Sequence, residues 1–265
     1  MTEAQELANL RKAMRGAKQQ TGVFSAKKLI RLAVDGHGDA LSVSWSGGRC
    51  STPVLRMALD IKPNIKVIHN DTGVEYPEME EFVKNIANKW GVNLIVAKPK
   101  TTFWEVCKKY GFPFQSRVGK GKPACCRWLK EYPLRDAIRE HGIGAQITGM
   151  RAVEARNRMF WTEQAGQFYF VKKYGLNCWR YNPIIFWTTK QLATFERLHN
   201  IPVCPIYDKY GLKRSGCWPC TGYKNWEQTM ARTNPKFLVK MKELMGTRIL
   251  DHFYQTQVAP CNQRG

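Results

Sequence analysis

The sequence predicts an α/β fold in which a doubly wound, mostly parallel sheet carries helices on both faces. Two observations predict it. Short apolar, strand-like segments alternate with segments of helical spacing between residues 40 and 148, and turn-forming residues separate the two kinds of segment. Sheets of this class bind their ligands at the carboxyl ends of the strands. We therefore expect the functional residues in the loops that follow the strands.

The expected elements follow one another from residue 40. The expected strands are 40–45, 65–69, 92–97 and 144–148, and the expected helices are 52–60, 78–90, 129–140 and 188–199. Pro53 lies in the first turn of a helix, where its missing N–H costs nothing. Phe82, Ile86 and Trp90 repeat at helical spacing. Residues 160–187 are aromatic and hairpin-like, and 202–219 have the composition of a loop.

Three regions are expected along the chain. Residues 1–36 form a basic helical extension without the apolar density of a core, and residues 37–200 form the α/β domain. Residues 201–265 contain a Cys-x-x-Cys loop and a basic, mostly helical C-terminal region. A basic helix face is either solvated or binds nucleic acid, and both alternatives stay open here.

The composition is that of a globular protein with a large excess of positive charge. Hydrophobic residues make up 43% of the 265 residues and charged residues 24%, which excludes a disordered or collagen-like chain. No apolar run approaches the roughly 18 residues of a spanning helix, and the first 20 residues are polar, so we expect a cytoplasmic protein without a membrane partner. The net charge of +21 predicts an anionic substrate or partner.

Four of the nine cysteines form two close pairs, Cys125 with Cys126 and Cys217 with Cys220. In a chain without a secretion signal, such thiols are metal ligands or reactive groups more often than disulfides. Thiolates bind tetrahedral zinc or iron–sulfur clusters, and two adjacent cysteines rarely reach one small ion without backbone strain. The pairs therefore favour a cluster over zinc, with reduced, unligated thiols as a third alternative. The other five cysteines are scattered: Cys50, Cys107, Cys178, Cys204 and Cys261.

The segment from Ser46 to Ser51, Ser-Gly-Gly-Arg-Cys-Ser, lies between the first strand and the first helix of the domain. Its two glycines allow backbone N–H groups to approach an anion, and the helix N-terminus behind them adds a positive dipole end. It is not a Walker A loop, because the Gly-Lys-Ser/Thr ending is absent. The segment is either an anion cradle or only a tight turn. Candidate phosphate or sulfate clamps follow the fourth expected strand at Arg151, Arg156 and Arg158.

These motifs resemble, in order, those of the phosphoadenosine phosphosulfate (PAPS) reductase family, and in particular its iron–sulfur branch, the adenylyl-sulfate (APS) reductase-like proteins. This family belongs to the PP-loop adenine nucleotide alpha-hydrolase-like superfamily. The resemblance covers about residues 40–225 and includes the Ser-Gly-Gly-x-x-Ser loop from Ser46. The further matching segments are Asp71-Thr72-Gly73 with Tyr76-Pro77-Glu78, Lys122 to Arg127, Gly149 to Arg158, Asn182 to Ile185, and Arg214 to Thr221. The resemblance implies the same fold, with a PP-loop nucleotide-binding domain at 37–200.

The resemblance also implies site residues and cofactors. It implies that an adenine nucleotide (APS, PAPS or ATP) is bound by Ser46, Gly47, Gly48, Arg49, Ser51, Asp71, Thr72 and Gly73. It implies a 4Fe–4S cluster held by Cys125, Cys126, Cys217 and Cys220. By the residues alone, Asp71 either recognises the nucleoside or caps the next helix. A reductase of this kind takes its electrons from a thioredoxin-like partner, and the oligomeric state stays open, a homo-oligomer included.

Three departures from the family pattern bear on mechanism. Arg49 and Cys50 stand where ATP-using PP-loop enzymes commonly have Lys-Asp, and a thiol is a poor ligand for magnesium, whereas Arg49 suits a phosphate or sulfate. Ala155 replaces the serine of the Gly-x-Arg-x-x-Glu-Ser region. Cys261 occupies the near-terminal position of the family's nucleophilic cysteine but lacks its Glu-Cys-Gly-Leu-His motif, so it is either the nucleophile or incidental.

We therefore expect an oxidoreductase that reduces APS or PAPS to sulfite, with Cys261, Arg151 and Arg158 as catalytic candidates. Two alternatives compete with it. The first is a PP-loop enzyme that inserts sulfur into, or otherwise modifies, DNA or tRNA with ATP, which the +21 charge favours. The second is a non-catalytic nucleic-acid-binding protein that keeps the fold and the cluster for structure.

Overall fold

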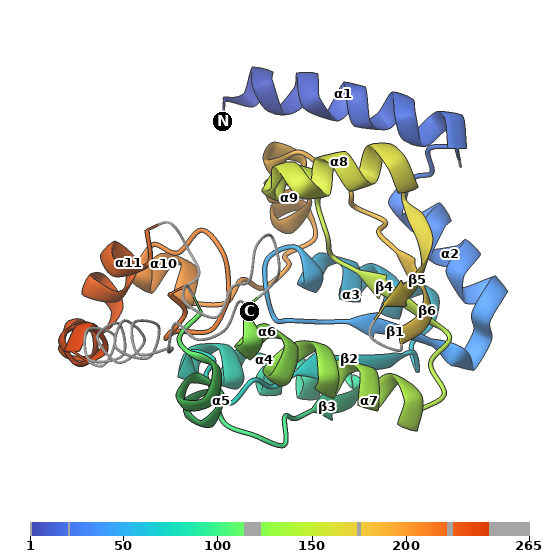
Figure 1. Ribbon diagram of the computed structural model, residues 1–265. Coiled ribbons are helices and arrows are strands. Elements are labelled where there is room, and N and C mark those ends of the chain that lie inside the picture. Colours follow the sequence, from blue (N-terminus) through green and yellow to red (C-terminus); the bar gives the residue numbers. More distant parts are fainter. Residues whose placement is uncertain (1, 21, 114–122, 174–175, 222–224, 244–265) are drawn as a thin grey trace, which may run out of the picture.

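The computed structural model describes residues 2–20, 22–113, 123–173, 176–221 and 225–243, and its centre is a six-stranded sheet (Figure 1). The strand order is β3-β2-β1-β4-β6-β5. The strands are β1 Leu41–Ser44, β2 Lys66–Asn70, β3 Asn93–Ala97, β4 Ala145–Thr148, β5 Phe168–Lys173 and β6 Leu176–Tyr181. All neighbours are parallel except β5, which runs antiparallel to β6 at the edge. The predicted doubly wound, mostly parallel sheet is confirmed.

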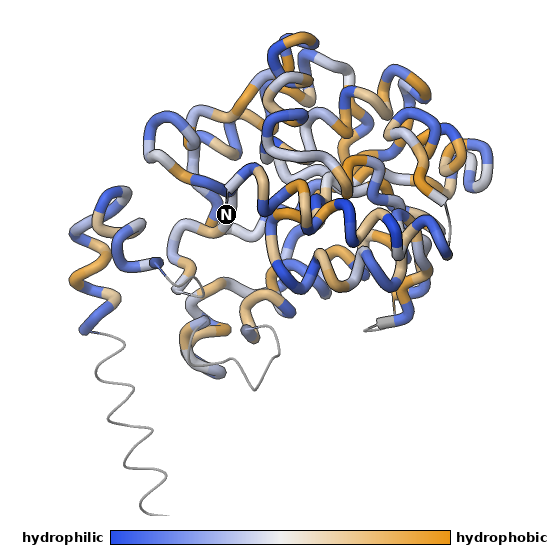
Figure 2. The backbone as a smooth tube through the Cα atoms, turned by 90° about the horizontal axis from the view of Figure 1, so that it is seen from above, coloured by the Kyte–Doolittle hydropathy of each residue, from blue (hydrophilic) through white to orange (hydrophobic). Residues whose placement is uncertain are grey.

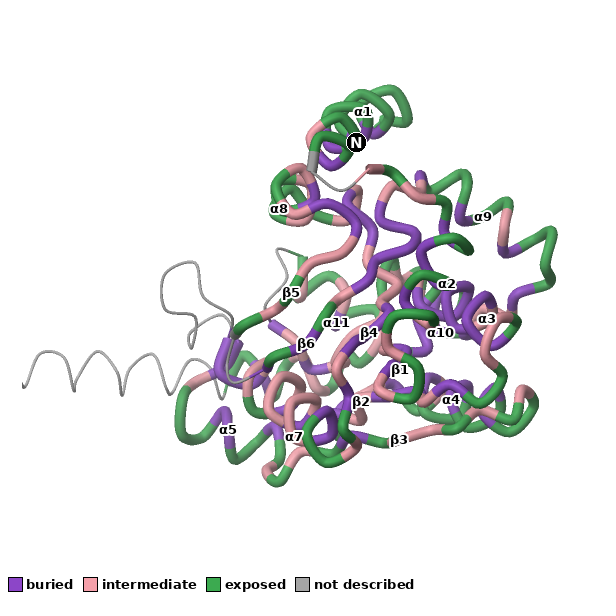
Figure 3. The backbone as a smooth tube through the Cα atoms, turned by 90° about the vertical axis from the view of Figure 1, so that its right-hand side faces the viewer, coloured by how far each residue is buried: buried purple, intermediate pink, exposed green. Residues whose placement is uncertain are grey.

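Helices cover both faces of this sheet. Because successive side chains of a strand point to opposite faces, Val67 and Ile68 of β2 enter different apolar clusters. Val67 packs in the main core, to which the helices α2 (Ala26–His37), α3 (Ser51–Ile61) and α4 (Pro77–Trp90) contribute. Ile68 packs with α7 (Tyr132–Glu140) on the other face. Figure 3 shows the buried residues concentrated in the strands and in the helices beside them.

The remaining helices surround this frame, and along them hydrophilic and hydrophobic residues alternate (Figure 2). They are α1 Glu3–Gln20, α5 Phe103–Tyr110, α6 Ala124–Cys126, α8 Arg156–Ala165, α9 Thr189–Leu198, α10 Ile206–Tyr210 and α11 Trp226–Thr233, with a π-helical turn at Arg127–Glu131 and 3-10 turns at Gly38–Ala40 and Ala152–Glu154. Residues 235–243 are also helical. None of the helices in the described part of the chain has the length and apolar composition needed to cross a bilayer.

Two helical segments differ from what the sequence predicts. Leu29, Ile30 and Ala33 of α2 are fully buried in the main core, although residues 1–36 were expected to lack core residues. Helix α5 was not expected at all. Its start is fixed by a capping box, in which Thr102 accepts a hydrogen bond from the N–H of Glu105 while the Glu105 carboxylate accepts one from the N–H of Thr102.

Helix α1 docks along α8 at one end of the molecule (Figure 1). Leu10, Ala13 and Ala17 are buried in this contact, and a Cβ on Gly16 would lie 2.7 Å from the carbonyl oxygen of Glu163. The chain therefore uses its small residues to bring the two helices close together. The exposed face of α1 carries its basic residues Arg11, Lys12, Arg15 and Lys18.

Candidate functional site

The predicted anion loop, residues 46–51, turns tightly between β1 and α3. Gly47 has a left-handed φ of 69°, and a Cβ there would lie 2.4 Å from the sulfur of Met79, so this position requires glycine. The Ser46 N–H donates to the Ser51 hydroxyl at 3.2 Å, and that hydroxyl donates to the Gly48 carbonyl oxygen at 3.2 Å. The loop thus places the N-terminus of α3 at the carboxyl end of the first strand, as an anion site requires.

The side chain of Arg49, a predicted ligand of the anion, is held by α9. Its Nε–H donates to Oε1 of Glu196 at 3.1 Å and its Nη2–H to Oε2 of the same carboxylate. The hydrogen bond to Glu196 raises the pKa of Arg49, against the opposing effect of burial. The backbone N–H of Arg49 donates to the Tyr207 hydroxyl at 3.2 Å. The structure therefore ties Arg49 to the protein, and its role toward a ligand stays a prediction.

Arg151, Glu154 and Arg158 come from the segment after β4 and meet Cys50 of the loop. The Cys50 thiol lies 3.2 Å from Glu154 Oε1, and Arg151 Nε lies 3.3 Å from the Cys50 sulfur. Arg158 is ion-paired with Glu154 through Oε2. Burial lowers the pKa of Arg158, and the positive charges of Arg214 and Arg151 act in the same direction. Both predicted clamps, Arg151 and Arg158, lie here.

Gly149 explains how the two segments come so close. A Cβ at Gly149 would lie 2.6 Å from the Cys50 carbonyl oxygen and 2.6 Å from the Ser51 Cα, distances that real Cβ atoms do not show. Glycine therefore permits backbone-to-backbone contact between the β4 loop and the anion loop. The third candidate clamp, Arg156, is exposed at the start of α8 and takes no part in these contacts with Cys50.

The segment from Arg214 to Trp218 joins the anion loop to the second predicted nucleotide segment. A Cβ on Gly48 would lie 2.8 Å from the Ser215 hydroxyl. Farther along, the Cys217 sulfur lies 3.7 Å from the Thr72 hydroxyl, and the Trp218 N–H donates to the Val74 carbonyl oxygen at 3.0 Å. We call residues 214–218 the bridging segment. It connects two of the family motifs, which are distant in sequence, at the carboxyl ends of the strands β1 and β2.

Asp71 and Gly73 shape the second of these segments. The Asp71 carboxylate accepts a hydrogen bond from the Gly73 N–H at 2.9 Å, and its other oxygen lies 3.6 Å from Lys98 Nζ. Gly73 has a left-handed φ of 68°, and Thr72 is buried. Asp71 therefore holds a turn at the carboxyl end of β2, and its contact with a nucleoside stays a prediction.

Three of the four paired cysteines, Cys125, Cys126 and Cys217, lie in a separate apolar cluster, which we call the thiol region. It contains Cys125 and Cys126 at α6, Cys217 of the bridging segment, and apolar side chains of α5 and α11. The pKa of Cys125 is raised by its hydrogen bond with Cys126, by burial, and by the nearby thiols of Cys107 and Cys220. The predicted pairs therefore come together, and no pattern in the sequence indicated that Cys107 joins them.

The thiol region has the donor chemistry of an iron–sulfur site. Its donors are soft thiols in a largely apolar surrounding, which suits a cluster better than a hard ion. Within the described ranges, no three His, Cys, Asp or Glu side chains are arranged to hold one metal ion. Two residues of the predicted site region lie outside the described residues: the candidate nucleophile Cys261, and Lys122, which precedes the first cysteine pair in the chain.

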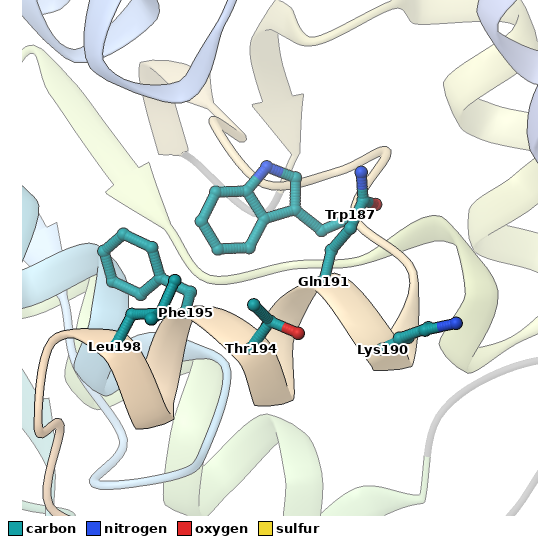
Figure 4. A pocket seen from close by; sticks show the side chains of 6 residues that line it. All are labelled: Trp187, Lys190, Gln191, Thr194, Phe195 and Leu198. Carbon is teal, nitrogen blue, oxygen red and sulfur yellow. The ribbon is translucent and has the colours of Figure 1, made fainter.

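A shallow hollow follows α9 on its outer side (Figure 4). Its lining is Trp187, Lys190, Gln191, Thr194, Phe195 and Leu198. None of the predicted site residues lines it, so it is separate from the anion loop and the thiol region.

Cys50 and Glu154 are the site residues that the sequence did not identify as partners. Cys50 stood out as a departure from the family pattern, and Glu154 belonged to a matching motif. Their contact joins positions 104 residues apart, so no local pattern shows it. The same holds for Glu196, which lies 147 residues from Arg49.

Comparison with known proteins places these features in one family. A family model described as the phosphoadenosine phosphosulfate reductase domain matches residues 40–223. An uncharacterized protein of Methanocaldococcus jannaschii is 30% identical over 190 residues, which are 71% of this chain and 43% of that protein, so the chain spans less than half of this relative. The adenosine 5'-phosphosulfate reductase of Rhodococcus erythropolis is 29% identical over 227 residues, 82% of this chain and 85% of that enzyme.

Solved structures show the same fold. The phosphoadenylyl-sulfate reductase of Candida auris matches with a TM-score of 0.58 at 20% identity, over 82% of this chain and 96% of that one. The FMN adenylyltransferase of Candida glabrata, in complex with FAD and inorganic pyrophosphate, matches with a TM-score of 0.51 at 11% identity, over 79% and 72% of the two chains. Because the family model covers more than half of the chain, the protein belongs to the phosphoadenosine phosphosulfate reductase family of oxidoreductases.

Proposed function

We propose that this protein reduces an adenylyl sulfate, APS or PAPS, to sulfite. One observation carries the proposal: the bridging segment lies against both the anion loop, with its cationic side chains, and the cluster that contains the thiols of Cys125, Cys126 and Cys217. The site thus combines groups that bind a nucleotide's phosphosulfate with groups that serve redox chemistry. The family membership of residues 40–223 supports the same reaction class.

The residues have distinct roles in this proposal. Backbone N–H groups of the anion loop and the N-terminus of α3 bind the anionic group of the nucleotide. The guanidinium groups of Arg151 and Arg158 neutralise the phosphate and sulfate charges. Asp71, Thr72 and Gly73 follow β2, the strand next to β1, and they line the part of the site that binds the nucleoside. Cys50 replaces a carboxylate at the loop, so this binding does not depend on magnesium.

A 4Fe–4S cluster would be held by Cys125, Cys126, Cys217 and Cys220. When bound, it would supply a redox-active group. The chain's own contribution is to hold Cys125, Cys126 and Cys217 in an apolar cluster and to connect Cys217 with the nucleotide segment through Thr72. Arg127 and Lys130 follow the first pair and offset the negative charge of the thiolates.

Reduction of sulfate to sulfite takes two electrons, which a thioredoxin-like dithiol partner supplies. A thiol of the protein attacks the sulfate sulfur and forms a thiosulfonate, and the nucleoside phosphate leaves. The dithiol then releases sulfite and becomes a disulfide. Cys261 is the candidate for this thiol by its position in the sequence.

The test incubates anaerobically purified protein with APS, PAPS and ATP in separate reactions and measures sulfite, AMP or adenosine bisphosphate, and pyrophosphate. Sulfite from APS or PAPS is the expected result. The Arg151→Ala variant should lose at least about a hundredfold in rate, because it removes a charge contact to the reacting group. Arg56→Ala, on the exposed face of α3, is the matched control. Pyrophosphate from ATP without sulfite would contradict the proposal.

A second candidate function, modification of DNA or tRNA, is favoured by one surface. Phe160 and Trp161 of α8 are 59% and 63% exposed, and α8 packs against α1, whose exposed residues include Arg11, Lys12, Arg15 and Lys18, in a chain of net charge +21. Exposed aromatic rings among cations stack on the bases of a single-stranded segment. If this surface binds a polyanion, affinity for tRNA or duplex DNA should fall on the order of a thousandfold or more between about 50 and 200 mM salt. Negligible affinity at the lower salt removes this candidate.

A further inference from the structure

Helix α1 packs against the segment that carries the candidate clamps. It contacts both α8 and the 3-10 turn Ala152–Glu154, which directly follows Arg151. Leu10 of α1 lies in one buried apolar cluster with Ala152 and Ile185, and the Ala152 N–H donates to the Ile185 carbonyl oxygen at 2.8 Å. The family model begins at residue 40, so this helix lies outside the matched region. A segment that precedes the family domain therefore supports the loop on which the clamp is built.

Glu6 is the acidic residue that α1 buries in this contact. It is 9% exposed, and its Oε1 accepts hydrogen bonds from the Thr189 N–H at 2.9 Å and from the Thr189 hydroxyl at 3.3 Å. Burying a carboxylate is costly, so its place in the contact needs a reason. Capping of α9 is not that reason, because Thr188 and Gln191 already form a capping box at the start of this helix. The hydrogen bond from the Thr189 hydroxyl is the part of the contact that capping does not explain.

The Thr189 hydroxyl connects Glu6 to Arg151. The Arg151 Nη1–H donates to this hydroxyl at 3.4 Å and to the Trp187 carbonyl oxygen at 3.3 Å. A hydroxyl has a single hydrogen, so the oxygen that accepts from Arg151 donates its own hydrogen to Glu6. On the other side of the guanidinium, Nε lies 3.3 Å from the Cys50 sulfur in the anion loop. Guanidinium, hydroxyl and carboxylate thus form a chain of hydrogen bonds that runs from the anion loop to α1.

We propose that Glu6 is a positioning residue for sulfate reduction, an inference that rests on the proposed function. Acting through the Thr189 hydroxyl, its carboxylate fixes the Arg151 guanidinium beside the anion loop before the nucleotide binds. An arginine that is already ordered loses less rotamer freedom when it binds an anion, and a preorganised cation costs no reorganisation during the reaction. Helix α1 is then part of the functional unit, although Glu6 itself acts from behind the clamp.

The test is a double-mutant cycle between Glu6 and Arg151 in the full chain, purified anaerobically. Glu6→Ala alone should lower kcat/KM for sulfite release by about tenfold, because residues in one hydrogen-bond network are coupled to this extent. In the Arg151→Ala background the same change should cost less than about twofold, because the side chain that Glu6 positions is gone. A carboxylate that only docks α1 would cost the same factor in both backgrounds, and that result overturns the proposal.

Thr189→Val tests the link without disturbing the contact between the helices. Valine keeps the shape of threonine and the N–H that donates to Glu6, and it removes only the hydroxyl. We expect a loss of about tenfold in kcat/KM with an unchanged Tm, and little further loss when Glu6→Ala is added. Wild-type kcat/KM in Thr189→Val overturns the proposal.

Glu3→Ala is the matched control, because Glu3 lies on the same helix and its 61% exposed side chain is 3.6 Å from Lys190 Nζ of α9. It should keep kcat/KM within about twofold of the wild type. A loss equal to that of Glu6→Ala would assign the effect to general docking of α1 and overturn the proposal.

Isothermal titration with APS and PAPS runs the same cycle on binding alone, so it does not depend on turnover. Glu6→Ala should weaken nucleotide binding in the wild-type background and not in the Arg151→Ala background. Wild-type protein that binds either nucleotide without forming sulfite overturns the proposed function, and the titration cycle still decides the role of Glu6. Absence of binding to both nucleotides overturns both.

Discussion

The anion loop and the thiol region lie at the same edge of the sheet but are held by different means. The loop rests on the main apolar core. It is fixed by hydrogen bonds among its own residues, by the contact of Gly47 with Met79, and by the hydrogen bonds of Arg49 to the buried carboxylate of Glu196. The thiol region is a satellite cluster, assembled from α5, α6, the bridging segment and α11. The first region is held by contacts with the main core, whereas the second is held by a smaller cluster that includes Cys125, Cys126 and Cys217. Binding is therefore expected to matter to the fold mainly in the second.

The largest effect should come from the thiol region. Cys217→Ser should abolish iron binding and lower the free energy of unfolding by on the order of 5 kcal/mol, because metal binding to a site absent from the unfolded chain is folding free energy. Wild-type anaerobic protein should be brown, with about four irons per chain. Iron analysis and denaturant unfolding of both proteins check this.

Cys178→Ala is the matched control for that experiment, because Cys178 is buried on the α7 face, outside the thiol region. It should keep its iron. Stoichiometric zinc without iron in the wild-type protein would remove the cluster from the proposal, and the contrast between the two regions with it.

In the anion loop, the largest effect should follow loss of a charge. Arg49→Ala leaves the carboxylate of Glu196, 6% exposed, without its partner. The Arg49 side chain is 42% exposed, so water screens part of the interaction and we expect a loss of about 2 to 3 kcal/mol in unfolding free energy. Arg56→Ala breaks an exposed pair with Asp60 and should cost less than about 1 kcal/mol. Equal costs in urea titrations would contradict the role of burial.

A smaller effect is expected where the β4 loop contacts the anion loop. Gly149→Ala places a methyl group against the backbone of Cys50 and Ser51, which should cost about 1 to 2 kcal/mol of stability and weaken AMP binding. Gly144→Ala, at the other end of β4, meets only the Ala40 methyl at 3.8 Å and is the control. Calorimetric Tm values and AMP titrations measure both consequences. If the two variants behave alike, the close backbone contact does not constrain the site.

The smallest effect concerns His69, which lies between the anion loop and the segment that contacts the bridging segment. Its Nδ1 lies 3.0 Å from the Trp45 carbonyl oxygen before the anion loop, and its Nε2 lies 3.5 Å from Glu75 on the side of the bridging segment. Burial opposes its charged form, but Glu75 and the Trp45 carbonyl outweigh it and raise the pKa of His69 above 6.5. A group whose pKa is higher in the folded protein than in the unfolded chain contributes its full stability at pH values below its unfolded-state pKa. That stability is lost as the pH rises through its folded-state pKa.

Unfolding free energy should therefore decline from about pH 6.5 upward, in step with deprotonation of His69. In His69→Gln this part of the pH dependence should disappear. Denaturant titrations at several pH values compare the two slopes, and an unchanged slope in the variant would assign the dependence to other groups.

The sequence was sufficient to predict the sheet because each strand carries its own signal. Strands β1 to β4 are short apolar runs bounded by turns, and they lie within about two residues of the predicted positions. Helix α5 was missed because its buried residues, Phe103, Val106 and Cys107, span only two turns. The capping pair of Thr102 and Glu105 was the available signal.

The candidate site could be predicted in parts but not in its pairings. Motifs located the anion loop, the clamps Arg151 and Arg158, and the paired cysteines, because each is a local run of residues. The partners of Arg49 and Cys50 could not be found in this way. Glu196 and Glu154 reach the loop from 147 and 104 residues away, and only packing of the whole sheet brings them there. Cys107 joined the thiol region for the same reason.

The separation of the two cysteine pairs in the chain has a consequence for how the protein is made. Cys126 leaves the ribosome roughly ninety residues before Cys217, an interval on the order of 5 to 20 seconds at usual rates of synthesis. During that time strands β4 to β6 and helix α9 emerge, while the first pair of thiols waits without the second. The proposed cluster could therefore be completed only after all six strands have been synthesised, because Cys217 and Cys220 follow the last strand in the chain. Oxidation of Cys125 and Cys126 in this interval would end maturation before the site can close.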